Sequence, residues 1–100
     1  MAQIPIIGSE GKPILYAYLG EGKLHFQFEY YGSGENRMDY EFIHSVAPVD
    51  YPAIAIKFGL DSTAEILSAI QQISDEGRGE ELHQALTDKV IPNELFTWMS

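Results

Sequence analysis

Hydrophobic and polar residues alternate along two stretches in the first half of the chain. The stretch from Leu24 to Tyr31 places Leu24, Phe26, Phe28 and Tyr30 on one face and His25, Gln27, Glu29 and Tyr31 on the other. The next stretch places Met38, Tyr40, Phe42, His44 and Val46 on one face and Arg37, Asp39, Glu41, Ile43 and Ser45 on the other. Strict alternation predicts half-buried strands with one apolar face and one polar face.

Two further apolar runs precede these strands and are separated from them by glycine-rich turns. Ile4–Ile7 is followed by the turn-like segment Gly8–Lys12, and Pro13 opens the run Ile14–Leu19, which Gly20-Glu21-Gly22 ends. A third glycine-rich segment, Gly32–Asn36, separates the two alternating stretches. Successive strands joined by short turns predict an antiparallel β-meander of three to four strands.

The second half of the chain has helical periodicity. Asp50 is expected to cap a helix over Tyr51–Phe58 that Gly59 ends, and Asp61 or Ser62 to cap a longer one. The longer helix carries an apolar stripe made of Ile66, Leu67, Ile70 and Ile73. After Gly77 and Gly79, a third helix is expected over Glu80–Lys89, with Leu82 and Leu86 facing inward and Pro92 ending it.

Strands followed by helices predict an α+β fold, with an antiparallel sheet packed on two to three C-terminal helices. The 100 residues are expected to form one domain, strand-rich over 1–47 and helix-rich over 50–90. The segment 91–100, with Leu95, Phe96 and Trp98, is expected to pack on this body either as a last strand or as a non-strand segment.

The net charge of the chain narrows the classes of molecule that it is expected to bind. The chain carries 15 Asp and Glu against 6 Lys and Arg, a net charge of −9 spread over both halves. Nucleic acid is disfavoured as a partner because phosphate binding depends on clustered basic residues. An acidic surface instead suits a basic protein partner, or serves solubility alone.

Cysteine is absent, which excludes disulfides, thiolate metal sites and a cysteine nucleophile. The N-terminus lacks the basic start and long apolar run of a signal peptide, and no stretch approaches the length of a membrane span. We therefore expect a cytoplasmic protein that makes no membrane contact.

The three histidines do not form a recognisable metal or catalytic motif. Glu80 and His83 share a helix face, but one such pair is typical of a solvated surface. His44 lies on the predicted core face, which favours a hydrogen-bonded structural role, whereas His25 on the polar face stays open. Gly77-Arg78-Gly79-Glu80 lacks the phosphate-loop pattern and is interpreted as a turn between helices. No nucleophile elbow occurs, so we expect no catalytic residue, no metal and no cofactor.

Most aromatic residues of the strand half, Tyr16 and Tyr18 among them, are assigned to the core, with Tyr31 as the exception. Two acidic surfaces then remain as candidate partner-binding sites. The first comprises Glu29, Asp39 and Glu41 with Tyr31 on the outer sheet face and Glu35 in the adjoining loop. The second comprises Asp75, Glu76, Glu80 and Glu81 around the turn between the last two helices. Each is either a solvated face or a surface that meets a basic partner.

The C-terminal third resembles a known group of proteins. The segments are Ile73-Ser74-Asp75-Glu76-Gly77-Arg78-Gly79-Glu80-Glu81-Leu82 and Ile91-Pro92-Asn93-Glu94-Leu95-Phe96-Thr97-Trp98. Together with the acidic, cysteine-free profile, they resemble the small immunity proteins of bacterial polymorphic toxin systems, especially contact-dependent growth inhibition. The resemblance implies neutralisation of one cognate basic toxin domain, often an RNase or DNase.

Three other functions stay open at this point. The first is a phage-type DNA mimic that inhibits a nucleic-acid-binding enzyme. The second is a small enzyme or ligand-binding domain that uses His25 or His44. The third is an adaptor module whose charge serves solubility, and Ile43 on the outer sheet face leaves a sheet-mediated homodimer open as well.

Overall fold

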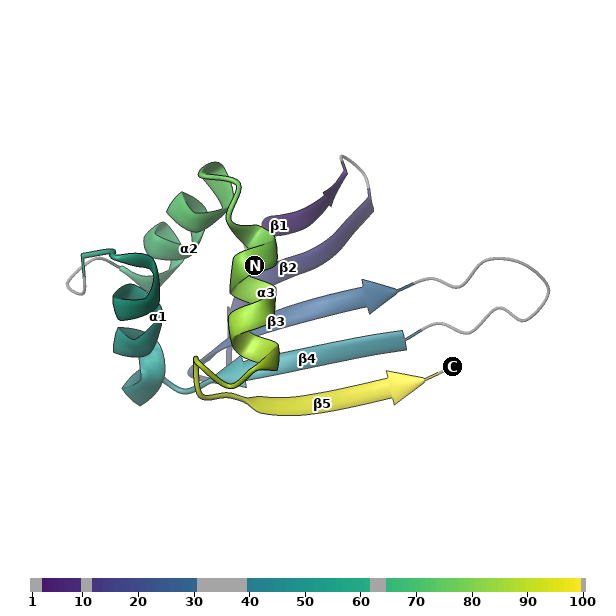
Figure 1. The fold of residues 1–100 in the computed structure, drawn as a ribbon. Helices are drawn as coiled ribbons and strands as arrows, with labels where there is room; N and C mark the ends of the chain where they lie inside the picture. The colour runs from purple at the N-terminus through teal and green to yellow at the C-terminus, as the bar shows by residue number, and fades with distance from the viewer. Residues whose placement is uncertain (1–2, 10–11, 31–39, 62–64, 100) are drawn as a thin grey trace.

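The described part of the chain forms a five-stranded antiparallel sheet with three α-helices and one short 3-10 helix (Figure 1). The computed structural model describes residues 3–9, 12–30, 40–61 and 65–99. The elements in chain order are β1 (Ile4–Ser9), β2 (Lys12–Gly20), β3 (Lys23–Tyr30), β4 (Tyr40–Val46), a short 3-10 helix (Pro48–Asp50), α1 (Tyr51–Phe58), α2 (Ile66–Asp75), α3 (Gly79–Thr87) and β5 (Glu94–Met99). This confirms the α+β fold, with a meander followed by helices.

The two faces of β3 and β4 are those that the alternation predicts. Leu24 lies opposite Val46, Phe26 opposite His44 and Phe28 opposite Phe42, so these residues share the inner face. Leu24, Phe26 and Val46 have no exposed surface. Leu24, Phe26 and Val46 therefore form the floor of the core.

The C-terminal tail is a strand, which adds a fifth member to the sheet. β5 pairs antiparallel with β4, with Leu95 opposite His44 and Phe96 opposite Ile43. The strand order in space follows the order in sequence from β1 to β5, although all three helices lie between β4 and β5 along the chain.

The helix ends differ in part from expectation. α1 has the predicted bounds, and Gly59 adopts the left-handed conformation with φ 67° that ends it. Asp50 occupies the N-cap position of α1 but makes no side-chain capping hydrogen bond. Asp61 does not cap α2, because the chain is still extended at Glu65 and the helix begins at Ile66. Ser62 lies outside the described residues.

The third helix ends before the position at which Pro92 would have to end it. α3 stops at Thr87, two residues before the predicted end, and Lys89 adopts a left-handed conformation with φ 61°. The amide of Val90 then donates to the carbonyl of Ala85 at 3.0 Å, as in a Schellman motif. A lysine thus occupies a position that glycine usually fills.

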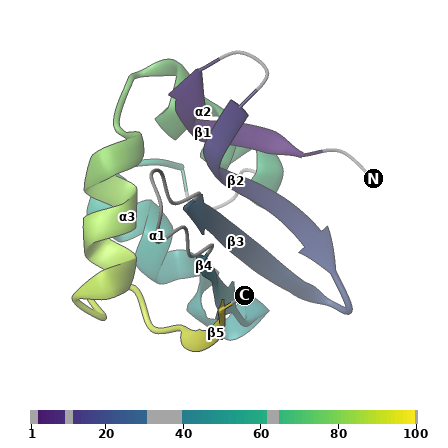
Figure 2. The same ribbon diagram turned by 90° about the vertical axis from the view of Figure 1, so that its right-hand side faces the viewer.

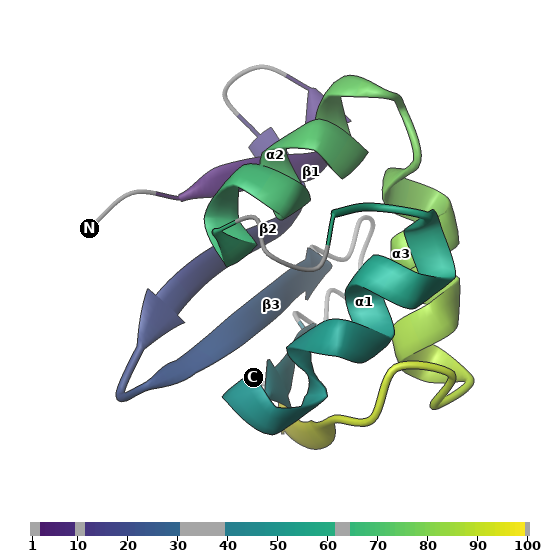
Figure 3. The ribbon, with the colours of Figure 1, turned by 90° about the vertical axis from the view of Figure 1, so that its left-hand side faces the viewer.

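All three helices lie on the same side of the sheet, as Figures 2 and 3 show from opposite ends. Their fully buried side chains meet the inner face of the sheet: Ile54 from α1, Ile70 and Ile73 from α2, and Leu82 and Leu86 from α3. None of the helices in the described part of the chain has the length and apolar character needed to cross a membrane.

One close approach fixes α3 against β1. A Cβ atom at Gly79 would lie 2.5 Å from the carbonyl oxygen of Ile6 and 2.7 Å from its Cγ2. Real Cβ atoms do not come so near to backbone atoms, so only glycine fits where this helix starts. β3, β4 and β5 extend past α3 on the side where β3 ends, and the inner face is covered only in part there (Figure 1).

Candidate functional site

Two glutamates stand side by side on the outer, helix-free face of the sheet. Glu29 of β3 lies directly opposite Glu41 of β4. The amide nitrogen Nε2 of Gln27 donates to Oε1 of Glu29 at 3.0 Å and to Oε1 of Glu41 at 3.2 Å. One amide group therefore holds both carboxylates together, on the outer face where the alternation places them.

Two tyrosines join this pair: Tyr16 is buried, as expected, and Tyr18 is half-buried, but neither faces inward as predicted. Tyr16 lies opposite Gln27 and Tyr18 opposite His25, so both belong to the outer face. The hydroxyl of Tyr16 donates to Oε1 of Glu29 at 2.9 Å, and that of Tyr18 donates to Oε1 of Gln27 at 3.0 Å.

Burial of the two tyrosines, together with the nearby carboxylates, raises the pKa of both hydroxyls. For Tyr16, the hydrogen bond to Glu29 adds to this effect. Both phenols therefore stay protonated and act as hydrogen-bond donors at neutral pH. We name Tyr16, Tyr18, Gln27, Glu29 and Glu41 the outer-face acidic site. Tyr31, Glu35 and Asp39, the other members predicted for this surface, lie outside the described residues.

A shallow depression of about 550 Å³ adjoins this site on the same face. Its lining comprises Tyr18, Gly20, Glu21, His25, Ile43, Ser45 and Phe96. Phe96 is 48% exposed there, which gives the face an apolar part beside its acidic part.

His25 is held at both ring nitrogens in this depression. Its Nε2 lies 2.9 Å from the carbonyl oxygen of Gly20, which can only accept, so Nε2 carries the proton. Nδ1 therefore accepts from the hydroxyl of Ser45 at 2.7 Å. Because both nitrogens are engaged, these contacts support a structural role for His25.

Two of the four carboxylates of the second acidic surface pair with nearby bases. Arg78 Nη2 lies 2.7 Å from Glu81 Oε2, while Arg78 Nη1 lies 3.7 Å from Glu76 and Lys57 Nζ lies 3.7 Å from Glu81. The Arg78 guanidinium holds the pKa of the Glu81 carboxyl below its usual range. Asp75 accepts from Gln71, and Glu80 is exposed in the first turn of α3.

Arg78 also ties this turn to α1. Its Nη1 donates to the carbonyl of Phe58 at 3.1 Å, and its guanidinium lies 4.6 Å from the centre of the Phe58 ring. The segment around Gly77 and Gly79 is thus a connection between α2 and α3, as its sequence indicates, with its arginine used inside the fold.

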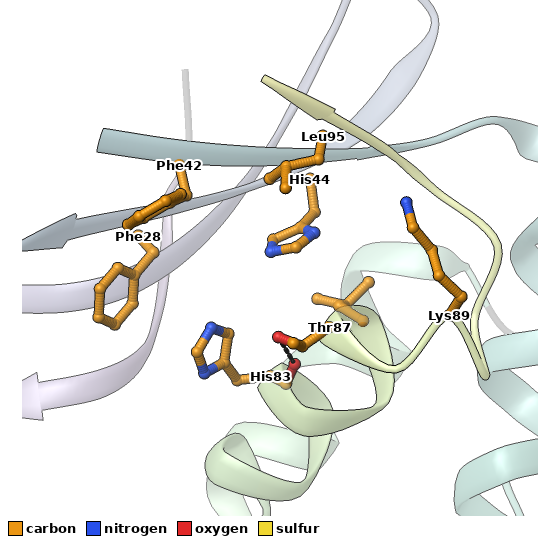
Figure 4. A pocket seen from close by; sticks show the side chains of 8 residues that line it. Phe28, Phe42, His44, His83, Thr87, Lys89 and Leu95 are labelled. Carbon is orange, nitrogen blue, oxygen red and sulfur yellow. Dashed lines mark hydrogen bonds between the residues drawn. The ribbon is translucent and has the colours of Figure 1, made fainter. Parts of the chain in front are cut away.

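A pocket opens on the opposite, inner face, where α3 covers the sheet only in part. Its volume is about 280 Å³. Its walls come from β3, β4, β5, α3 and the residues after α3 (Figure 4): Phe28, Phe42, His44, His83, Leu86, Thr87, Lys89 and Leu95.

The solvated surface predicted for His83 was wrong. The His83 ring is half-buried and stacks on Phe28, with centroids 5.1 Å apart and planes 1° from parallel. It also meets His44 edge-on at 6.2 Å. The helical period placed His83 next to the Leu82–Leu86 stripe, and this proximity was the available signal that it faces the sheet.

His44 has the hydrogen-bonded structural position that its place on the core face predicts. It is 5% exposed, and its Nδ1 lies 2.9 Å from Oδ1 of Asn93. Burial lowers the pKa of both His44 and His83, so both rings are neutral near pH 7. No group of three or more potential metal ligands occurs within the described ranges.

Comparison of this chain with protein-family models, with curated proteins and with solved structures finds no match.

Proposed function

We propose that this chain is an immunity-type inhibitor that binds a basic toxin domain, a nuclease, in the cytoplasm through its outer-face acidic site. The observation that carries the proposal is the pairing of Glu29 and Glu41 on the helix-free face, held by one shared amide. The resemblance of the C-terminal third to toxin immunity proteins suggests the class of partner.

The pairing costs stability in the isolated protein. Like charges directly opposite each other on adjacent strands repel and destabilise the sheet. A lysine or arginine of a partner placed between the two carboxylates would remove that repulsion. The pair therefore presents two carboxylates on one open face, where a single cation of a partner can meet both.

The surroundings of the pair also suit a protein interface. Tyrosine is among the residues enriched at the energetic centres of interfaces, and Tyr16 and Tyr18 flank the carboxylates. Ile43 and Phe96 add apolar surface to the same face, beside the acidic site. The acidic site would select a partner by charge, and the apolar surface beside it would add area that the partner buries.

The acidic surface around α3 is the weaker candidate. Glu76 and Glu81 already neutralise Arg78 and Lys57, so a partner would have to compete with contacts inside the fold.

A nuclease binds the phosphates of its substrate with lysine and arginine in a groove. Carboxylates on an open sheet face can occupy this groove in place of the phosphates.

The test is binding to basic nuclease toxin domains, taken first from any large secreted protein encoded immediately upstream of this gene, measured at several salt concentrations and by rescue of growth on co-expression. Glu41→Lys should weaken binding by about 2–5 kcal/mol and slow association. Glu80→Lys, an equal charge change on α3, is the matched control and should bind nearly as the parent does.

The proposal fails if Glu41→Lys binds and protects like the parent, or if Glu80→Lys is the variant that loses binding. Capture of a DNA-binding enzyme and not of the toxin domain would favour the DNA-mimic alternative.

A further inference from the structure

The inner-face pocket lies on the side of the sheet opposite the outer-face acidic site. We propose that it binds a small apolar carboxylate, whose apolar body lies against Phe28, Phe42 and Leu95 and whose carboxylate faces His44, His83 and Lys89. This ligand site goes beyond the proposed function, and its test does not depend on a toxin partner.

The hydrogen-bond network fixes which nitrogen of His44 is available. The side-chain amide of Asn93 donates to the carbonyls of Leu86 at 2.9 Å and Ile91 at 2.7 Å, so its Oδ1 is the atom that faces His44. Oδ1 can only accept, and Nδ1 of His44 therefore carries the proton. The second nitrogen, Nε2, is left with a free lone pair in the neutral ring.

That nitrogen is open to the pocket. Within the described part of the chain, no fully buried side-chain nitrogen or oxygen lacks a partner. Nε2 of His44 has no hydrogen-bond partner there, so it is reached by solvent, and the pocket is the space beside it. Figure 4 shows the rings of His44 and His83 pointing toward one another across this space.

The charge of the pocket is opposite to that of the molecule. The chain as a whole carries −9, yet none of the eight lining residues is acidic, and Lys89 is the one with a fixed charge. Its ammonium contacts the carbonyl and Oδ1 oxygens of Asn93, at 2.6 and 3.3 Å, and both of these partners are neutral. A ligand carboxylate would give this cation the counter-charge that Asn93 does not supply.

The backbone at Lys89 is consistent with a role for its side chain. The φ angle of 61° suits glycine, and a residue with a Cβ atom is disfavoured there. The remaining walls are apolar, and the parallel stack of His83 on Phe28 leaves flat faces. A volume of about 280 Å³ lies at the lower end of ligand pockets, which fits a single ring or a short branched chain.

Binding should take up protons. In the described structure, the two imidazoles face each other, and Lys89 is the other titratable group near them. A carboxylate beside these rings favours their charged form and opposes the effect of burial. Affinity for the ligand is therefore expected to rise as the pH falls from about 7.5 toward 5.5, through the ordinary histidine range.

The experiment uses the full chain with sodium benzoate as the probe and benzamide as its neutral control, followed by NMR of the histidine ring signals. Benzoate should shift the signals of His44 and His83 in a saturable way and raise their pKa, and benzamide should bind more weakly. Lys89→Gly, which relieves the left-handed strain, should keep the fold and weaken benzoate about fivefold or more. Lys23→Ala, an equal charge change at the first residue of β3, is the matched control.

Absence of any shift at His44 and His83 at high benzoate concentration would overturn the site. Equal binding of benzamide, or unchanged benzoate affinity in Lys89→Gly, would overturn the recognition of a carboxylate. Loss of affinity in Lys23→Ala to the same degree would mean that net charge and not the pocket is responsible.

Discussion

Replacing Glu41 by glutamine should stabilise the isolated protein while it weakens the proposed complex. The amide oxygen of glutamine can still accept from Nε2 of Gln27, so Glu41→Gln removes a charge and keeps the hydrogen bond. Glu29 then loses its like-charged neighbour on β4.

The size of the gain follows from the shared amide. The two Oε1 atoms lie 3.0 and 3.2 Å from one nitrogen, so they are at most 6.2 Å apart, the sum of these distances. Two unit charges at that separation repel by about 0.7 kcal/mol at the dielectric constant of water. Cross-strand pairs contribute about 0.2–1 kcal/mol, which agrees with this figure.

Urea unfolding at low and high salt is the assay. At low salt, Glu41→Gln should raise the free energy of unfolding by about 0.5–1 kcal/mol. At about 1 M salt the Debye length is roughly 3 Å, and the gain should largely disappear. The double variant Glu29→Gln with Glu41→Gln should add little, because one substitution already removes the repulsion. A variant that is less stable than the parent at low salt would refute the reasoning.

Three further predictions concern stability. Gly79→Ala should lose about 1–3 kcal/mol in denaturant unfolding, because the added Cβ overlaps the β1 backbone; an unchanged midpoint would contradict this close approach. Asn93→Ala should cost about 1–3 kcal/mol, because it leaves Nδ1 of the buried His44 without an acceptor; a thermal melt unchanged from the parent would exclude this role. Burial lowers the pKa of His44 and His83 in the folded state, so the unfolded chain takes up these protons first. The two histidines therefore make their full contribution to stability above about pH 6.5, the ordinary pKa of histidine. The protein loses this contribution as the pH falls below about 6.5 and through the lowered pKa values of the two histidines in the folded state. His83→Phe, which can keep the stack on Phe28, should reduce this loss in melts between pH 7.5 and 5, and an identical pH profile would count against it.

Strict alternation made the faces of β3 and β4 predictable, whereas the faces of less regular segments could not be predicted. In Leu24–Tyr30 and Tyr40–Val46 every second residue is aliphatic or aromatic, so period two fixes both faces and the register confirms them. The segment Ile14–Leu19 is apolar or aromatic throughout, and such a run hides which side chains face outward. Tyr16 and Tyr18 were assigned to the core for this reason, although their hydroxyl groups need partners that the outer face provides.

Sequence patterns within single elements also failed to predict features that depend on tertiary contacts. His83 stands among polar residues on α3, but it is half-buried because the helix crosses the sheet above Phe28. The common face of Glu29 and Glu41 was foreseen from the alternation, whereas their direct opposition and the Gln27 amide that joins them depend on a register that no single strand encodes. The neutralisation of Glu76 and Glu81 by Arg78 likewise depends on the geometry of the α2–α3 turn.

The insertion of every helix between β4 and β5 has a kinetic consequence. The pairings of β1 through β4 join neighbours along the chain, whereas β5 reaches β4 only after residues 47–93 have folded back. Closing so long a loop is slow compared with forming hairpins, so we expect β5 to dock last. Until it does, one edge of β4 is open to pairing with another chain, which makes this intermediate the aggregation-prone species. Pulsed hydrogen exchange during refolding should protect the amides of β2 and β3 before those of β5, and simultaneous protection would rule out this order.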